Sequence, residues 1–177
     1  HCATRFYVMG ERSVEERATP DEIRQIAELA GQSVKDGAFG FSTSRASVHK
    51  LPDGRCIPGT YAERDELMAI AAAVGEHGGI MQTVMNFEDI ENEMELIGDG
   101  ADLCRGALFS QVCNPLAEAR QRQDERVREF RANGRNITGL TVPRSAGGVT
   151  GLSTPHFFHS PSWNELRTME FEQRLTA

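Results

Sequence analysis

Hydrophobic and polar positions follow two different periods along most of this chain. Short, continuous apolar runs have the composition of buried strands, and they cover residues 38–41, 80–84, 107–113 and 137–142. Between them, apolar residues recur three or four positions apart, which is the spacing of one face of an amphipathic helix. The pattern therefore predicts strands and helices that alternate along the chain.

Capping and turn residues mark where these helices begin and end. Thr19, Pro20 and Glu22 predict a helix start with a capping box, and Gly37 ends that helix. The remaining predicted starts are a brief helical turn at Ser13 with Glu16, a second capping box at Thr60 with Glu63, a cap at Asn86, a start at Asn114-Pro115 and a cap at Ser162 with Glu165.

The alternation of strands and helices with short connections predicts the fold class. It is typical of α/β proteins in which a parallel sheet is joined by right-handed crossovers. Four consecutive βα units amount to about half of a (β/α)8 TIM-type barrel. We expect residues 1–177 to form a single α/β domain of this kind. Because four parallel strands cannot close a barrel, they would form an open sheet or pair with a second copy.

The stretch from Gly37 to Thr60 carries the most distinctive chemistry. After its apolar start it turns abruptly polar, and it continues as a loop of roughly fifteen residues with Pro and Gly as turn formers. Loops at the carboxyl ends of parallel strands carry the active sites of α/β enzymes. Two interpretations remain open, an ordinary surface loop and a substrate site built from Ser42, Thr43, Ser44, Arg45 and His49.

Composition and charge argue against several classes of protein. The chain has 26 acidic and 19 basic residues, which gives a net charge of −7. Nucleic-acid-binding proteins usually present a basic face, so this charge argues against that function. No apolar run approaches the length of a membrane span, and no signal-peptide pattern is present. The cysteines are scattered without CxxC spacing, so we expect reduced thiols and a cytoplasmic location.

The loop also carries a family resemblance. The run Gly-Ala-Phe-Gly-Phe-Ser-Thr-Ser-Arg, the histidine after it and the closing Ile-Pro-Gly-Thr resemble the N-acyl-D-amino-acid deacylase (D-aminoacylase-like) branch of the amidohydrolase superfamily. Weaker similarity covers nearly the whole chain, at residues 5–10, 143–144, 151–152, 156–157 and 163–175. The resemblance implies that this chain, which starts with His1, is an internal piece of a (β/α)8 barrel with central to late βα units.

The resemblance implies a reaction and gives the site residues roles. The parent protein would be a metal-dependent hydrolase that cleaves the amide bond of N-acyl-D-amino acids or a related C–N bond. Arg45 or Arg144 would hold the substrate carboxylate bidentately, or would instead cap a helix or pair with an acid. His49 would orient the substrate or act as acid or base, or would be a solvent-exposed loop residue.

The metal is where this chain departs from the family pattern. Amidohydrolases bind zinc through a His-x-His on an early strand, histidines at later strand ends and a late Asp. No histidine stands near residues 83–84 or 111–112, and only His1 matches a rim position. We therefore expect zinc in the parent enzyme and none held by this chain alone. The alternative function is a non-catalytic α/β domain for ligand binding or oligomer assembly.

We expect this chain to associate with further copies of itself. Half a barrel leaves two strand edges and part of an apolar face uncovered, which favours a homodimer or a higher assembly. The contact would centre on residues 80–84 or 137–142, whichever strand lies at the edge.

Overall fold

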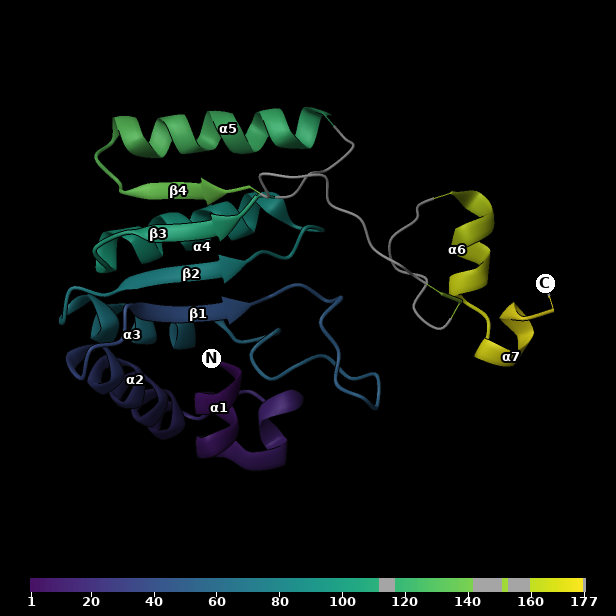
Figure 1. Ribbon diagram of the computed structural model, residues 1–177, viewed down its shortest axis with the longest axis horizontal. Coiled ribbons are helices and arrows are strands. Elements are labelled where there is room, and N and C mark those ends of the chain that lie inside the picture. The colour runs from purple at the N-terminus through teal and green to yellow at the C-terminus, as the bar shows by residue number, and fades with distance from the viewer. Residues whose placement is uncertain (112–116, 142–150, 153–159, 177) are drawn as a thin grey trace. The chain divides into compact units, whose positions relative to one another are not determined.

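The structure is a computed structural model that describes residues 1–111, 117–141, 151–152 and 160–176. The chain divides into two units, His1–Thr141 and Val142–Ala177 (Figure 1). In the second unit, helices α6 (Pro161–Arg167) and α7 (Phe171–Arg174) follow one another. Arg174 ties them to the preceding chain, because its guanidinium donates to the Leu152 carbonyl at 2.9 Å.

The first unit is the predicted α/β alternation. A helix α1 (Cys2–Met9) and a 3-10 turn η1 (Gly10–Val14) precede α2 (Pro20–Lys35), β1 (Gly40–Ser44), α3 (Arg64–Gly75), β2 (Ile80–Val84), α4 (Ile90–Leu103), β3 (Ala107–Ser110), α5 (Ala117–Ala132) and β4 (Ile137–Leu140). All four strands are parallel, and they lie in the order β1-β2-β3-β4. The expected parallel sheet of consecutive βα units is confirmed.

Alternate residues of each strand point to opposite faces of the sheet, and the described helices of the first unit cover one of these faces. Helices α2, α3 and α4 pack on the strands from that side, where Phe41, Met81, Phe109 and Ile137 are buried. The other face is partly exposed. A row of residues in register crosses it from β1 to β4, and its members are Ser42, Gln82, Leu108 and Thr138.

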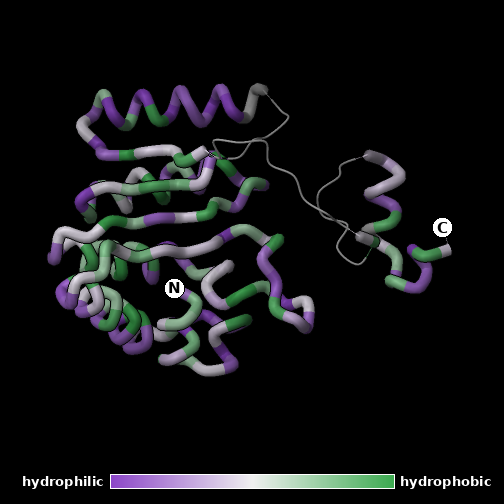
Figure 2. Tube along the Cα trace, in the orientation of Figure 1, coloured by the Kyte–Doolittle hydropathy of each residue, from purple (hydrophilic) through white to green (hydrophobic). Residues whose placement is uncertain are grey.

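The outer helix α5 packs against α4 and β4. It is hydrophilic along most of its length (Figure 2), and its buried anchor is Phe130, with Val127 half-buried beside it. Gly134 follows the helix with φ +84°, a conformation that glycine adopts without strain. The predicted start at 114–115 lies outside the described residues.

The first strand is displaced from its predicted bounds. The apolar run 38–41 predicts a strand that ends at Phe41, whereas β1 covers Gly40–Ser44. The reason is the pairing with β2, which continues through Thr43↔Thr83 and Ser44↔Val84. Polar residues expected in a loop are therefore held rigidly in a strand.

One of the predicted helix caps is present in the structure, and three others are not. The capping box of α2 is confirmed, with Thr19 and Glu22 each bonding the other's backbone. Three other predicted caps are wrong, because the side chain named for each serves elsewhere or lies inside the helix. Thr60 bonds a carbonyl of the preceding loop, and α3 starts after Glu63; α4 and α6 are capped by Asp89 and Ser160 instead of Asn86 and Ser162.

The strand order settles which segments lie at an edge. Residues 80–84 form β2, which is flanked by β1 and β3 and is not an edge strand. Of the two strands named for self-association, only β4 lies at an edge. Among the described residues, no helix combines the length and apolar character needed to cross a bilayer.

Candidate functional site

The predicted site residues other than Arg144 lie in β1 near its carboxyl end and in the loop that follows it, and Figure 1 shows this strand and loop. The loop from 45 to 63 returns on itself, since Lys50 and Cys56 form an isolated antiparallel bridge. Strand alternation divides the polar residues of β1 between the two faces of the sheet. Ser42 and Ser44 lie on the less covered face, and Thr43 lies under the helices.

Ser44 and His49 form a hydroxyl–imidazole pair. Ser44 Oγ lies 2.6 Å from His49 Nδ1, and the turn that permits this contact is closed by the bond from His49 N to Ala46 O at 3.1 Å. His49 is exposed, and within the described residues its Nε2 has no hydrogen-bond partner. The pair can bind a polar ligand and exchange a proton with it.

Ser42 meets Gln82 on the same face of the sheet. The two residues are register partners in β1 and β2, and Ser42 Oγ donates to Gln82 Oε1. Ser42 is exposed and Gln82 half-buried, so the amide nitrogen of Gln82 and the serine oxygen can still bond a ligand. The exposed polar groups at this end of the sheet are thus hydroxyls, an amide and an imidazole.

Arg45 is engaged by the protein itself. Its Nε donates to Glu93 Oε1 at 2.6 Å and its NH1 to the Ala62 carbonyl at 2.7 Å. Glu93 is 1% exposed, and its second oxygen accepts from the Asn86 backbone N–H at 3.3 Å. The pairing with an acid, left open by the sequence, is what the structure contains. Arg144 lies outside the described residues.

Thr43 belongs to a second buried network that includes the first residue of the chain. Thr43 Oγ1 lies 2.8 Å from His1 Nδ1, and His1 Nε2 donates to Glu66 Oε1 at 2.8 Å. The same carboxylate oxygen accepts from Arg5 Nε at 2.8 Å. The side chains of His1 and Glu66 are 0% and 1% exposed. Thr43 is therefore a structural residue of this network in the described arrangement.

The sequence interpretation missed the two buried acids, Glu66 and Glu93. Each stands four residues before a fully buried isoleucine, Ile70 in α3 and Ile97 in α4, and so lies on the buried face of its helix. A carboxylate on an apolar helix face requires a cationic partner, and this spacing was the available signal.

No group of three or more histidine, cysteine or acidic side chains that could hold a metal ion occurs in the part of the chain that the structure describes. Both ring nitrogens of His1 are used by Thr43 and Glu66. The described residues therefore do not fit a zinc site.

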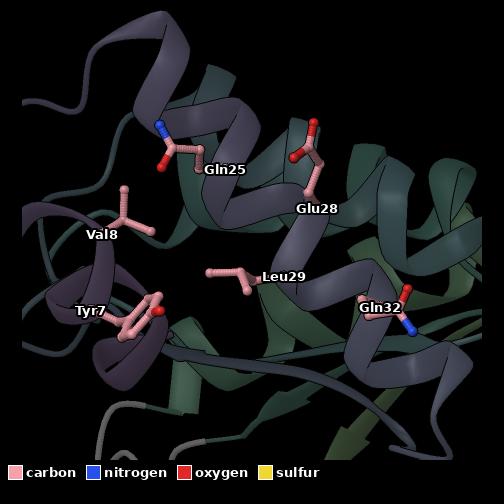
Figure 3. A pocket seen from close by; sticks show the side chains of 6 residues that line it. All are labelled: Tyr7, Val8, Gln25, Glu28, Leu29 and Gln32. Carbon is pink, nitrogen blue, oxygen red and sulfur yellow. The ribbon is translucent and has the colours of Figure 1, made fainter.

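A hollow of about 670 Å³ lies elsewhere, between α1 and α2 (Figure 3). Its lining residues are Tyr7 and Val8 of α1 and Gln25, Glu28, Leu29 and Gln32 of α2. It contains none of the predicted site residues, so it adds nothing to the cluster at the end of β1.

Comparisons of the chain with protein-family models, curated protein sequences and solved structures find no match.

Proposed function

We propose that this chain is about half of a (β/α)8 barrel in an amidohydrolase that cleaves the amide bond of N-acyl-D-amino acids or a related C–N bond. The observation that carries the proposal is the Ser44–His49 pair at the carboxyl end of the edge strand β1. That end of a parallel sheet is where α/β enzymes bind substrate. The loop motif that resembles the deacylases supplies this pair.

The exposed groups match the polar atoms of an acylamino acid. Hydroxyl and amide groups of Ser42, Ser44 and Gln82 can bond an amide N–H and carbonyl oxygen. His49 presents Nε2 as a proton donor or acceptor, and Ser44 fixes the orientation of the ring through Nδ1. Because Arg45 is bound to Glu93, it contributes to the position of the loop and not to the substrate carboxylate.

Zinc belongs to this proposal only through the family resemblance. In an amidohydrolase the ion polarises the scissile carbonyl and activates water. The described residues supply binding and proton-transfer groups, and the parent enzyme would supply the ligands of the metal.

Ligand titration followed by two-dimensional amide NMR tests the proposal. N-acetyl-D-leucine should shift the amide signals of residues 42–49 and 82–84, with a weaker effect from the L enantiomer. His49→Gln should weaken this binding about tenfold, the size of one lost hydrogen bond. His77→Gln alters an exposed histidine after α3, away from the loop, and should leave binding unchanged.

Shifts elsewhere in the chain, or equal binding by the His49→Gln variant, would overturn the proposed site. Release of free leucine on addition of zinc would extend the proposal to catalysis by the chain itself. Binding without turnover by the complete parent protein would support the non-catalytic ligand-binding alternative instead.

A further inference from the structure

A lysine and a cysteine face each other across the loop between β1 and α3. Lys50 and Cys56 are partners in the antiparallel bridge, which the bonds Leu51 N to Arg55 O at 2.8 Å and Ile57 N to His49 O at 3.2 Å hold together. Residues opposite each other in such a bridge have neighbouring side chains. The Lys50 ammonium donates to Cys56 Sγ at 3.1 Å.

In the part of the chain that the structure describes, no carboxylate competes for this ammonium. Among the described residues Lys50 has no acidic partner, although the chain contains 26 acids. Arg55 takes the acids of this region, since its guanidinium pairs with Asp53 at 2.7 Å and with Glu11 and Glu15 at 3.9 Å. A thiol beside an ammonium is the environment in which reactive cysteines occur.

The sulfur has two further polar neighbours, the Ser47 carbonyl, to which Sγ donates at 3.7 Å, and the Tyr61 hydroxyl. Tyr61 OH lies 3.3 Å from Cys56 Sγ, and Cys56 is only 6% exposed. The hydrogen bond with Cys56, followed by burial, raises the pKa of Tyr61, so the phenol keeps its proton and can donate to the sulfur. Tyr61 itself is 69% exposed, and it forms the solvent side of this cluster.

We propose that Cys56 and Lys50 are an oxidative modification site, where a peroxide converts the contact between them into a covalent sulfenamide cross-link. The thiolate attacks hydrogen peroxide, the O–O bond breaks, and the sulfur is oxidised to sulfenic acid as the peroxide is reduced. The hydroxide released takes a proton from the Lys50 ammonium and leaves as water. The neutral amine then attacks the sulfenic sulfur, an S–N bond forms, the S–O bond breaks and a second water leaves.

The cross-link would close a covalent ring through residues 50–56. It begins one residue after His49, whose carbonyl already takes part in this turn, so oxidation would lock the backbone that carries the imidazole. The chemistry is independent of the proposed hydrolase function, because the bond is detected by mass and needs no substrate.

Two other described cysteines serve as internal controls. Cys104 Sγ donates to the Ala71 carbonyl at 3.2 Å, and burial raises the pKa of this thiol to about 11. Cys2 Sγ donates to the Pro58 carbonyl at 3.1 Å. Within the described residues, neither sulfur is hydrogen-bonded to an amine.

The test is peptide mass mapping of the intact, folded chain after brief treatment with dilute hydrogen peroxide. We expect a peptide that joins Lys50 to Cys56, two hydrogen atoms lighter than its two parts and separated again by dithiothreitol. Cys56 should react at least about tenfold faster than Cys104. Lys50→Arg should retain the positive charge and accumulate sulfenic acid, which dimedone traps, without the cross-link.

Oxidation of Cys56 to sulfinic acid with Lys50 left free in the wild-type chain would overturn the proposal. So would a rate at Cys56 no higher than at Cys104, or a Lys50→Arg variant that loses the same two hydrogen atoms. All of these outcomes are read from the wild-type chain or from a variant at an exposed position, so none depends on rescuing a misfolded protein.

Discussion

The imidazole of His1 lies directly against the backbone of Gly59. A Cβ atom built on Gly59 would come within 2.6 Å of His1 Nδ1 and 2.9 Å of Cε1. Gly59 also has φ +91°, in the region that favours glycine. Two separate reasons therefore favour glycine at position 59. Its backbone has a positive φ, and a Cβ atom there would clash with the His1 ring.

Alanine substitutions separate these two requirements. Gly54 has nearly the same backbone angle, φ +89°, but nothing lies within 4 Å of its added Cβ. Gly54→Ala should lower the free energy of unfolding by about 1 kcal/mol, and Gly59→Ala by at least about 2 kcal/mol, because only the second also clashes. Urea unfolding measures both, and equal losses would show that the contact with His1 is unimportant.

Two adjacent threonines differ in one hydrogen bond. Thr43 and Thr83 are register partners and both are buried, yet Thr43 bonds His1 whereas Thr83 Oγ1 has no partner among the described residues. Thr43→Val should cost about 1–3 kcal/mol because it leaves His1 Nδ1 unpaired. Thr83→Val should be neutral or stabilising. Thermal or urea unfolding that ranks them the other way would contradict the network.

The Arg45–Glu93 pair can be tested from the acid side. Glu93→Gln should lower the free energy of unfolding by about 2–3 kcal/mol, because a largely buried guanidinium loses its counter-charge. Asp65→Asn, which removes the exposed partner of Arg17, should leave the unfolding midpoint essentially unchanged. Tighter binding of N-acetyl-D-leucine by Glu93→Gln would instead show that a released Arg45 serves the substrate.

Low pH should destabilise the first turn of α2, because the Glu22 carboxylate that bonds this turn becomes protonated. The backbone N–H of Thr19 donates to Glu22 at 2.8 Å, and this bond, with help from Arg12, lowers the pKa of Glu22 below its ordinary value of 4.5. A carboxyl group with a lowered folded-state pKa stabilises the fold above that ordinary value and loses this contribution as the pH falls.

Glu22→Gln keeps a side chain that can accept the same backbone bond but cannot titrate. The melting temperature of the wild-type chain should therefore fall more steeply than that of the variant between about pH 5 and pH 3. Circular dichroism at the two limits is sufficient. Parallel curves would mean that Glu22 does not contribute to acid sensitivity.

Local sequence patterns predicted the helices and strands better than they predicted which side chains bond to one another in the site. Apolar period and a capping box located α2 and β2, because those signals involve residues close in sequence. The ion pairs at Glu66 and Glu93 join residues 61 and 48 positions apart, which no local period encodes. Pairing with β2 also extended β1 past its apolar run, and so turned a predicted loop cluster into a strand with two faces.

The last prediction concerns the free edge at β4. Arg131 Nε donates to the Ile137 carbonyl at 2.8 Å, so the edge is satisfied in part. Leu140 remains 44% exposed at the end of this strand. Burial of apolar surface is worth about 25 cal/mol per Å2, so a few hundred Å2 on this sheet would favour a dimer by several kcal/mol.

We therefore expect concentration-dependent association at tens of micromolar in sedimentation equilibrium, roughly the range in which such a modest interface binds. Leu140→Lys should abolish it, because an edge lysine opposes strand pairing. Leu103→Lys is the matched control, since Leu103 is 42% exposed but ends α4 instead of a strand, and it should associate like the wild-type chain. A well-folded wild-type monomer over the whole range would show that the open sheet does not recruit a second copy.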